Sequence, residues 1–294
     1  MAWLELSLTV TAAQQAEVEG ALDELGALAV TLLDAQDHPI FEPGPGETPL
    51  WPEIALSALF EPDRDRVGLV HVLTDLVPDL APDRIAFRTV EDQDWTRAWM
   101  DQFQPMRFGR RLWIYPSNIE PPADDADAIV VRLDPGIAFG TGTHPTTALC
   151  LEWLDALDLA GLTVIDYGFG SGVLAIAALK LGAARVIGVD NDPQALAASR
   201  DNAERNGIAD RLALLTPDEF APETGDALVA NILAGPLAEL APRFAQCLKA
   251  GGALALSGIL AGQEAELVER YSAWFDALAI ATREDWIRIG GTRR

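Results

Sequence analysis

The residues best suited to chemistry begin with an acidic, glycine-rich turn. An apolar run at residues 164–165 leads into Asp166, and Gly168, Gly170 and Gly172 follow at alternate positions. Glycine lets the backbone approach a ligand closely, and the amides of a turn that opens a helix face that ligand. Dinucleotide enzymes space their glycines as G-x-G-x-x-G. The shorter spacing and the acid favour S-adenosylmethionine, which has cationic groups and no pyrophosphate. We therefore take Asp166, Gly168, Gly170 and Gly172 as candidate cofactor-binding residues, although tight packing within the fold also explains such a turn.

A second acidic residue lies where a ribose would bind. Asp190 ends an apolar run at residues 186–189, 24 positions after Asp166. In nucleotide-binding sheets, an acid about 20 residues beyond the glycine-rich turn accepts hydrogen bonds from ribose. A helix cap is the competing explanation, because Asp192 and Pro193 follow and the next helix begins there. We expect Asp192 to be the cap and Asp190 to bind the ribose.

A loop rich in threonine and glycine lies upstream, at residues 134–147. It contains four threonines, three glycines and a histidine. This density of hydroxyl groups and flexible backbone exceeds what a connection needs, so we expect the loop to cover the ligand. Phe139 could stack on adenine or face the sulfonium with its ring. His144 could serve as a base, but a lone histidine before proline more often fixes a loop by hydrogen bonding.

The fourth candidate is Asn231, which follows an apolar run at residues 227–230. Its carbonyl oxygen can accept a hydrogen bond from an amine and thereby aim the nitrogen lone pair. A further helix cap explains the same pattern. We take Asn231 as the candidate catalytic residue for transfer to an amine.

Composition restricts the class of protein and of partner. The 294 residues carry 21 basic and 45 acidic side chains, a net charge of −24. This field repels nucleic-acid phosphates and anionic lipid and favours a basic partner. The cysteines, Cys150 and Cys247, are too few for a disulfide framework and are not spaced as metal ligands. With no apolar run near the roughly 20 residues that span a bilayer, we expect a soluble, cytoplasmic protein without a metal site.

The elements that position these residues fall into two predicted domains. Residues 1–91 alternate as strand, helix, strand, strand, helix, strand, which is the ferredoxin-like order. The first 90 residues contain four arginines, no lysine and 16 acidic residues, which indicates either a solvated face or a surface for a basic ligand. The predicted strands are 3–10, 27–33, 54–60 and 84–90, and the predicted helices are 13–25 and 66–76.

A linker helix region is predicted over residues 92–107, where Trp95, Trp99 and Phe103 form one helical stripe typical of packing. The remaining domain, residues 108–294, repeats strand and helix from about residue 145 onward. Such repeats imply a mainly parallel, doubly wound α/β sheet with its ligand at the carboxyl ends of the strands.

These segments together resemble the PrmA family, the methyltransferases of large-subunit ribosomal protein 11. The resemblance covers nearly the whole chain, and F-G-T-G-T-H-P-T-T, within the loop at 134–147, is its most specific part. Phe169 departs from the family, which usually has cysteine there, so we expect altered packing, with cofactor affinity as the property affected. The other matching segments are Trp51, 95–108, 166–172, Asp190, 201–207, 231–237 and 257–260.

The resemblance implies a Rossmann-like, S-adenosylmethionine-dependent methyltransferase domain preceded by a ferredoxin-like α+β domain. It implies methylation, up to trimethylation, of lysine side chains and the N-terminal α-amine of ribosomal protein 11. The first domain would recognise the substrate and swing on the linker helix. Carried over by position, the family's cofactor ligands fall on Thr147, Gly168, Asp190 and Asn231. A monomer is expected, with neither specific DNA binding nor membrane association.

Three alternatives remain open. Nucleic-acid amino-methyltransferases also place an asparagine after a strand, but they need a basic groove and a stacking aromatic residue nearby; here Ile232, Leu233 and Ala234 follow instead. A non-catalytic, cofactor-binding partner of the ribosome would not need the complete set of candidate residues. An NAD dehydrogenase is disfavoured by the glycine spacing.

Overall fold

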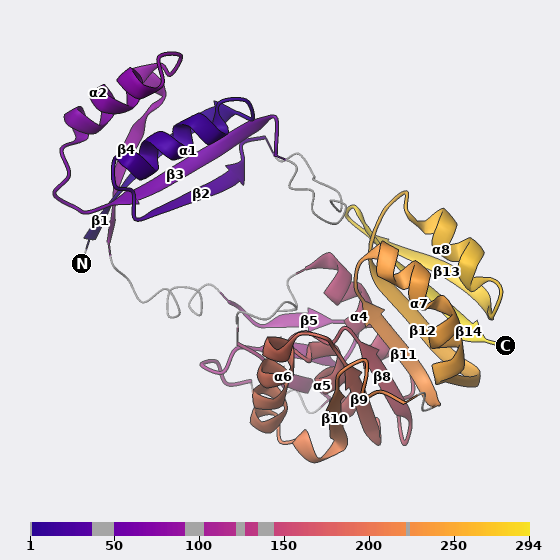
Figure 1. The fold of residues 1–294 in the computed structure, drawn as a ribbon. Coiled ribbons are helices and arrows are strands. Elements are labelled where there is room, and N and C mark those ends of the chain that lie inside the picture. Colours follow the sequence, from indigo (N-terminus) through magenta and orange to yellow (C-terminus); the bar gives the residue numbers. More distant parts are fainter. Residues whose placement is uncertain (1, 37–49, 92–102, 122–126, 135–143, 222–223) are drawn as a thin grey trace. The chain divides into compact units, whose positions relative to one another are not determined.

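The computed structural model describes residues 2–36, 50–91, 103–121, 127–134, 144–221 and 224–294 (Figure 1). The chain divides into two compact units, Met1–Trp95 and Thr96–Arg294. Each unit has a hydrophobic core of its own. In the described part of the chain, none of the helices is long and apolar enough to cross a membrane.

The first unit combines an antiparallel four-stranded sheet, in the order β2-β3-β1-β4, with two helices. Alternation along β1 turns Leu4, Leu6 and Leu8 to one face, where they form a core with Leu22 of α1 and Leu73 of α2. Both helices therefore cover the same face, and the predicted order of six elements is confirmed. The elements are β1 (Ala2–Thr11), α1 (Gln15–Glu24), β2 (Ala29–Asp34), β3 (Glu53–Phe60), α2 (Arg66–Leu76) and β4 (Ala86–Glu91).

The second unit contains a seven-stranded sheet in the order β10-β9-β8-β11-β12-β14-β13. The first five of these strands are parallel, and β14 is antiparallel to both of its neighbours. The chain moves outward in one direction from β8 and in the other from β11, so the order switches between them. In such sheets a ligand binds outside the carboxyl ends at the switch point. The strands are β8 (Thr163–Tyr167), β9 (Arg185–Val189), β10 (Leu212–Leu215), β11 (Gly225–Asn231), β12 (Leu248–Leu260), β13 (Phe275–Arg283) and β14 (Trp286–Arg293).

Helices cover both faces of this sheet, as the predicted doubly wound pattern requires (Figure 1). Val164 of β8 lies in the core that α4 and α5 share, while its neighbour Ile165 lies in the core of α7 and α8. The alternation of β8 side chains thus decides which residues lie beside which helix. The helices are α4 (Pro145–Ala156), α5 (Val173–Lys180), α6 (Pro193–Arg205), α7 (Ala234–Cys247) and α8 (Glu264–Tyr271).

The second unit also contains a small separate sheet, whose first strand begins before the predicted end of the linker region at residue 107. Its strands, in the order β5-β6-β7, are β5 (Met106–Phe108), β6 (Leu112–Tyr115) and β7 (Ile129–Arg132). Because β5 pairs with β6 and Phe103 is buried in the core of the second unit, the chain joins that unit before residue 107. Trp95 and Trp99 lie outside the described residues.

Candidate cofactor site and active site

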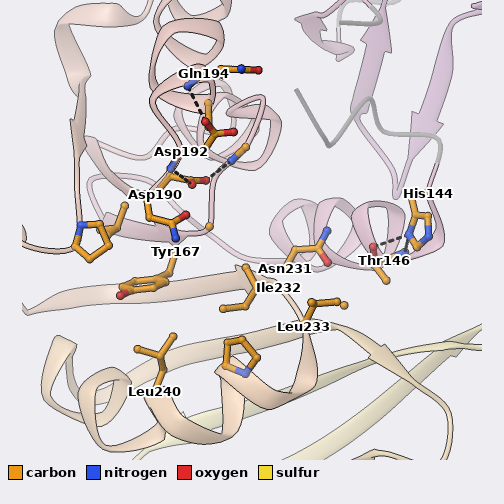
Figure 2. Close-up of a pocket in the computed structure, with 18 of the residues that line it drawn as sticks. His144, Thr146, Tyr167, Asp190, Asp192, Gln194, Asn231, Ile232, Leu233 and Leu240 are labelled. Atoms are coloured by element: carbon orange, nitrogen blue, oxygen red, sulfur yellow. Dashed lines mark hydrogen bonds between the residues drawn. The ribbon is translucent and has the colours of Figure 1, made fainter. Parts of the chain in front are cut away.

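A cavity of about 930 Å³ opens where β8, β9 and β11 end (Figure 2). Gly168 follows β8, Asp190 follows β9, and Asn231 is the last residue of β11. These three residues and Gly170 all line the cavity. The structure therefore brings four of the predicted site residues together from three separate segments.

The three glycines of the turn need their conformational freedom. Gly168, Gly170 and Gly172 have φ angles of 78°, 51° and 78°, in the left-handed region that other residues rarely adopt. A Cβ atom at Gly168 would overlap the side chain of Ile232, and one at Gly172 would lie 2.6 Å from the Oγ of Ser199. Gly172 is the N-cap residue of α5 and does not line the cavity.

The carboxylate of Asp190 is held by the turn that it faces. Its Oδ2 accepts a hydrogen bond from the amide of Gly170 at 2.9 Å, and its Oδ1 accepts one from the amide of Asp192 at 3.0 Å. Asp192 in turn accepts a hydrogen bond from the amide of Gln194 at 2.8 Å and caps α6. The prediction that Asp192 is the cap is confirmed, and Asp190 is left facing the cavity (Figure 2).

Asp166 does not line the cavity, so the structure does not place it for the direct contact with the cofactor that the motif predicts. Its side chain shares the sheet face of Val164, because residues two apart in a strand point the same way. Its Oδ2 accepts a hydrogen bond from the amide of Ala175 at 2.9 Å, while its buried Oδ1 has no hydrogen-bond partner among the described residues. Burial raises the pKa of the Asp166 carboxyl group to about 7; the nearby charge of Asp190 adds a smaller increase, and the bond from Ala175 opposes it.

Thr147 contacts Asn231 but does not itself line the cavity. Thr147 lies on α4 and is 1% exposed, and its Oγ1 accepts a hydrogen bond from the Nδ2 of Asn231 at 3.3 Å. This bond occupies the amide nitrogen and leaves the Oδ1 of Asn231 available as an acceptor. The alternative that Asn231 caps a helix is wrong, because the cap of α7 is Leu233.

His144 fixes the start of α4, as predicted for a loop-fixing histidine. Its Nδ1 accepts from the amide of Thr146 at 3.4 Å and lies 2.7 Å from the hydroxyl of the same residue. Burial lowers the pKa of His144, and the charge of Glu284 only partly opposes this effect. The imidazole is therefore neutral near pH 7. Phe139, with the rest of residues 135–143, lies outside the described part of the chain.

Sequence reasoning missed an aromatic and apolar wall of the cavity. Tyr167, Pro217 and Leu240 line it, and so does Trp286, whose ring centroid lies 4.7 Å from that of His144. Tyr167 stands inside the glycine-rich motif and could have been inferred from its place at the end of β8. Trp286 begins the last strand with no motif around it, so only the fold brings it to this site.

Phe169 fills space beside β9 and does not line the cavity. It is 3% exposed, and a Cβ atom built on Gly188 would lie 2.8 Å from its ring. The glycine therefore leaves room for the phenylalanine ring. The altered packing expected at this position therefore involves β9, and an effect of Phe169 on cofactor affinity remains a prediction.

Comparison with known proteins agrees with this architecture. Residues 2–294 match the family model described as ribosomal protein L11 methyltransferase (PrmA). The ribosomal protein L11 methyltransferases of Stenotrophomonas maltophilia (strain K279a) and Serratia proteamaculans (strain 568) are 56% and 54% identical, each over the full length of both chains. The crystal structure of ribosomal protein L11 methylase from Lactobacillus delbrueckii subsp. bulgaricus is 32% identical, with a TM-score of 0.59, and the match covers 65% of this chain and 98% of that one. This chain belongs to the PrmA family of ribosomal protein L11 methyltransferases.

Proposed function

We propose that this protein transfers methyl groups from S-adenosylmethionine to amines of ribosomal protein L11. The acceptors would be lysine side chains and the N-terminal α-amine, and the final products would carry quaternary trimethylammonium groups. The observation that carries this proposal is the convergence of Gly168, Asp190 and Asn231 on one cavity. The similarity over the full chain to proteins that carry this name supports the substrate.

The residues present suit the proposed cofactor. Asp190 would accept hydrogen bonds from the ribose hydroxyls, and the bare backbone of Gly168 and Gly170 would lie against the methionine portion. The buried Oδ1 of Asp166 has no hydrogen-bond partner among the described residues, and this carboxyl group would complement the positive charge of the cofactor from the core side of the glycine-rich turn. Gly172 would contribute by starting α5 at the end of that turn. When bound, the cofactor supplies an electrophilic methyl group. Phe139 remains a proposed adenine or sulfonium contact.

The chain's own contribution to transfer is to orient a neutral amine. The Oδ1 of Asn231 would accept a hydrogen bond from the amine and so direct its lone pair, with Thr147 holding the amide. Free lysine has a pKa near 10.4, and apolar neighbours such as Ile232 and Leu233 favour the uncharged form. His144 is committed to the cap of α4, so the proton would leave through water.

The N-terminal unit is proposed as a ferredoxin-like domain that recognises the substrate. Its element order and its sheet order of β2-β3-β1-β4 are those of that fold. The first 90 residues contain 16 acidic residues against four arginines, and this excess suits a basic ribosomal protein. A swing of this domain on the linker region before Phe103, a monomeric state and a cytoplasmic location remain proposals of the same kind.

Intact-mass spectrometry of purified L11 tests the proposal directly. Incubation with the enzyme and S-adenosylmethionine should add methyl increments to L11 and none to duplex or single-stranded DNA. The Asn231→Ala variant should lower turnover roughly 100-fold while binding S-adenosylhomocysteine nearly as well as the wild type. If the cofactor binds and no substrate gains mass, the substrate assignment is wrong; equal turnover of the variant would remove the role of Asn231.

A further inference from the structure

The segment that follows β10 is fixed by an arginine of α7. The Nη2 of Arg243 donates to the carbonyl oxygens of Pro217 and Phe220, both at 3.0 Å. The guanidinium carbon also lies 5.4 Å from the centroid of the Phe220 ring. One side chain therefore joins α7 to two points of this segment.

Among the described residues, the other hydrogen bonds of this turn, residues 216–220, join members of the turn to one another. The carbonyl of Thr216 accepts from the amides of Glu219 and Phe220, each at 3.1 Å, and the carboxylate of Glu219 accepts from the amide and hydroxyl of Thr216 at 2.9 and 3.0 Å. These bonds shape the turn but do not attach it to the sheet. Attachment comes from Arg243 and from the Phe220 ring, which packs edge-on against Tyr167 at 6.4 Å.

This turn contributes one residue, Pro217, to the wall of the cavity. Pro217 lines it together with Tyr167 and Leu240, and Figure 2 shows Tyr167 and Leu240 at the end away from His144. β10 lies beside β9, on the side away from β8. A ribose held by Asp190 at the end of β9 would therefore direct its base toward the residues that follow β10.

We propose that Arg243 is a positioning residue for the adenine half of the cofactor site. By holding both ends of the turn, it keeps the Pro217 ring at a fixed position in the cavity wall before any ligand arrives. Preorganisation of this kind lowers the entropic cost of binding. The proposal rests on the proposed binding of an adenosyl cofactor and is independent of which substrate accepts the methyl group.

A lysine at position 243 should not be able to perform the positioning role of Arg243. A guanidinium is planar, so it can bond to two carbonyls while stacking on an aromatic ring, whereas an ammonium is a compact charge without a stacking face. The Arg243→Lys variant would keep the charge and lose the geometry. We expect this variant to bind the adenosyl moiety about tenfold more weakly, because a tenfold change in affinity corresponds to the loss of about one net hydrogen bond.

Calorimetric titration of the full-length variant with two ligands tests the role. S-adenosylhomocysteine and 5′-methylthioadenosine, which lacks the amino-acid portion, should both bind about tenfold more weakly to Arg243→Lys. The KM for S-adenosylmethionine should rise by the same factor, with kcat at saturation within about twofold of the wild type. Arg293→Lys is the matched control, because Arg293 also bonds two distant carbonyls, those of Ala245 and Trp274, at 2.8 and 3.0 Å, and its strand ends away from the cavity.

A second variant, Pro217→Ala, gives a test that does not require Arg243→Lys to fold. It removes the ring from the cavity wall, so it should weaken 5′-methylthioadenosine binding several-fold in the otherwise wild-type protein. Where Arg243→Lys folds, the same substitution should have a smaller effect in that background. The proposal is overturned by unchanged ligand affinity in Arg243→Lys or in Pro217→Ala, by equal losses in Arg293→Lys, or by additive effects of the two substitutions. Failure of L11 methylation with these affinity changes intact would refute the proposed function alone.

Discussion

The buried carboxyl group of Asp166 gives the most quantitative prediction. Burial raises its pKa from 3.8 to about 7, and its Oδ1 has no hydrogen-bond partner among the described residues. The folded protein therefore retains a proton that the unfolded chain releases between about pH 4 and pH 7. By linkage, this group lowers the free energy of unfolding as pH rises through that interval. The penalty is about 2 kcal/mol at pH 5.5 and about 4 kcal/mol at pH 8, where both states are ionised.

Replacing Asp166 with Asn removes this penalty and keeps the shape of the side chain. The amide oxygen can still accept from Ala175, but the new NH₂ group takes the unpartnered position, which costs about 1–3 kcal/mol at any pH. The difference in unfolding free energy, variant minus wild type, should therefore be about 2 kcal/mol more favourable at pH 8 than at pH 5.5. The pH dependence of the difference is the diagnostic quantity, because the NH₂ cost cancels from it.

Urea unfolding of both proteins without cofactor at the two pH values measures this difference. Asp155→Asn is the control, since Asp155 is 2% exposed but accepts hydrogen bonds from the amide of Arg110 at 2.6 Å and from the Nε of Arg111 at 3.3 Å. That variant should be less stable than the wild type at pH 8. If the difference for Asp166→Asn does not change with pH, or becomes less favourable at pH 8, the Asp166 carboxyl group does not hold its proton in the folded protein as expected. The same variant should bind S-adenosylhomocysteine more weakly at pH 8, because the ionised carboxylate complements its ammonium group.

Three further predictions concern packing and the active site. Gly188→Ala should destabilise the protein by about 1–3 kcal/mol, because its Cβ would lie 2.8 Å from the Phe169 ring, whereas Gly20→Ala, with no atom within 4 Å, should be neutral or stabilising; urea unfolding compares them. Thr147→Val should lower kcat about tenfold with little effect on S-adenosylhomocysteine affinity, and Thr147→Ser should restore kcat, since only the hydroxyl contacts Asn231; equal kcat in the valine variant would contradict this. Asp190→Asn should weaken S-adenosylhomocysteine binding about tenfold or more in calorimetry, while unchanged affinity would exclude Asp190 from the ribose site.

The architecture was accessible from the sequence because local pattern and tertiary structure agree. The alternation of leucines in residues 3–10 predicts β1, and the repeats from residue 145 predict the doubly wound sheet that the structure contains. Asp190 and Asn231 end apolar runs, and parallel strands bring such ends to one edge of a sheet. Their meeting at one cavity therefore followed from topology alone.

The remaining features depend on distances that a sequence does not encode. The motif predicts that Asp166 contacts the cofactor. Alternation of side chains along β8 instead turns its carboxyl group toward α5, where it accepts a hydrogen bond from Ala175. Trp286 reaches the cavity only because the antiparallel β14 begins at the carboxyl edge of the sheet. β5 is three residues long, too short for a periodic signal, and so residues 106–107 were assigned to the linker.

Every role proposed for the site residues requires that the cofactor bind in this cavity with its reactive end at Asn231. A crystal structure with S-adenosylhomocysteine tests this arrangement. We expect the ribose hydroxyls at the carboxylate of Asp190, the adenine beside Pro217 and the sulfur on the side of Asn231. A ligand that leaves Asp190 without a contact, or that places its adenine at Asn231, would contradict the proposed orientation of the cofactor.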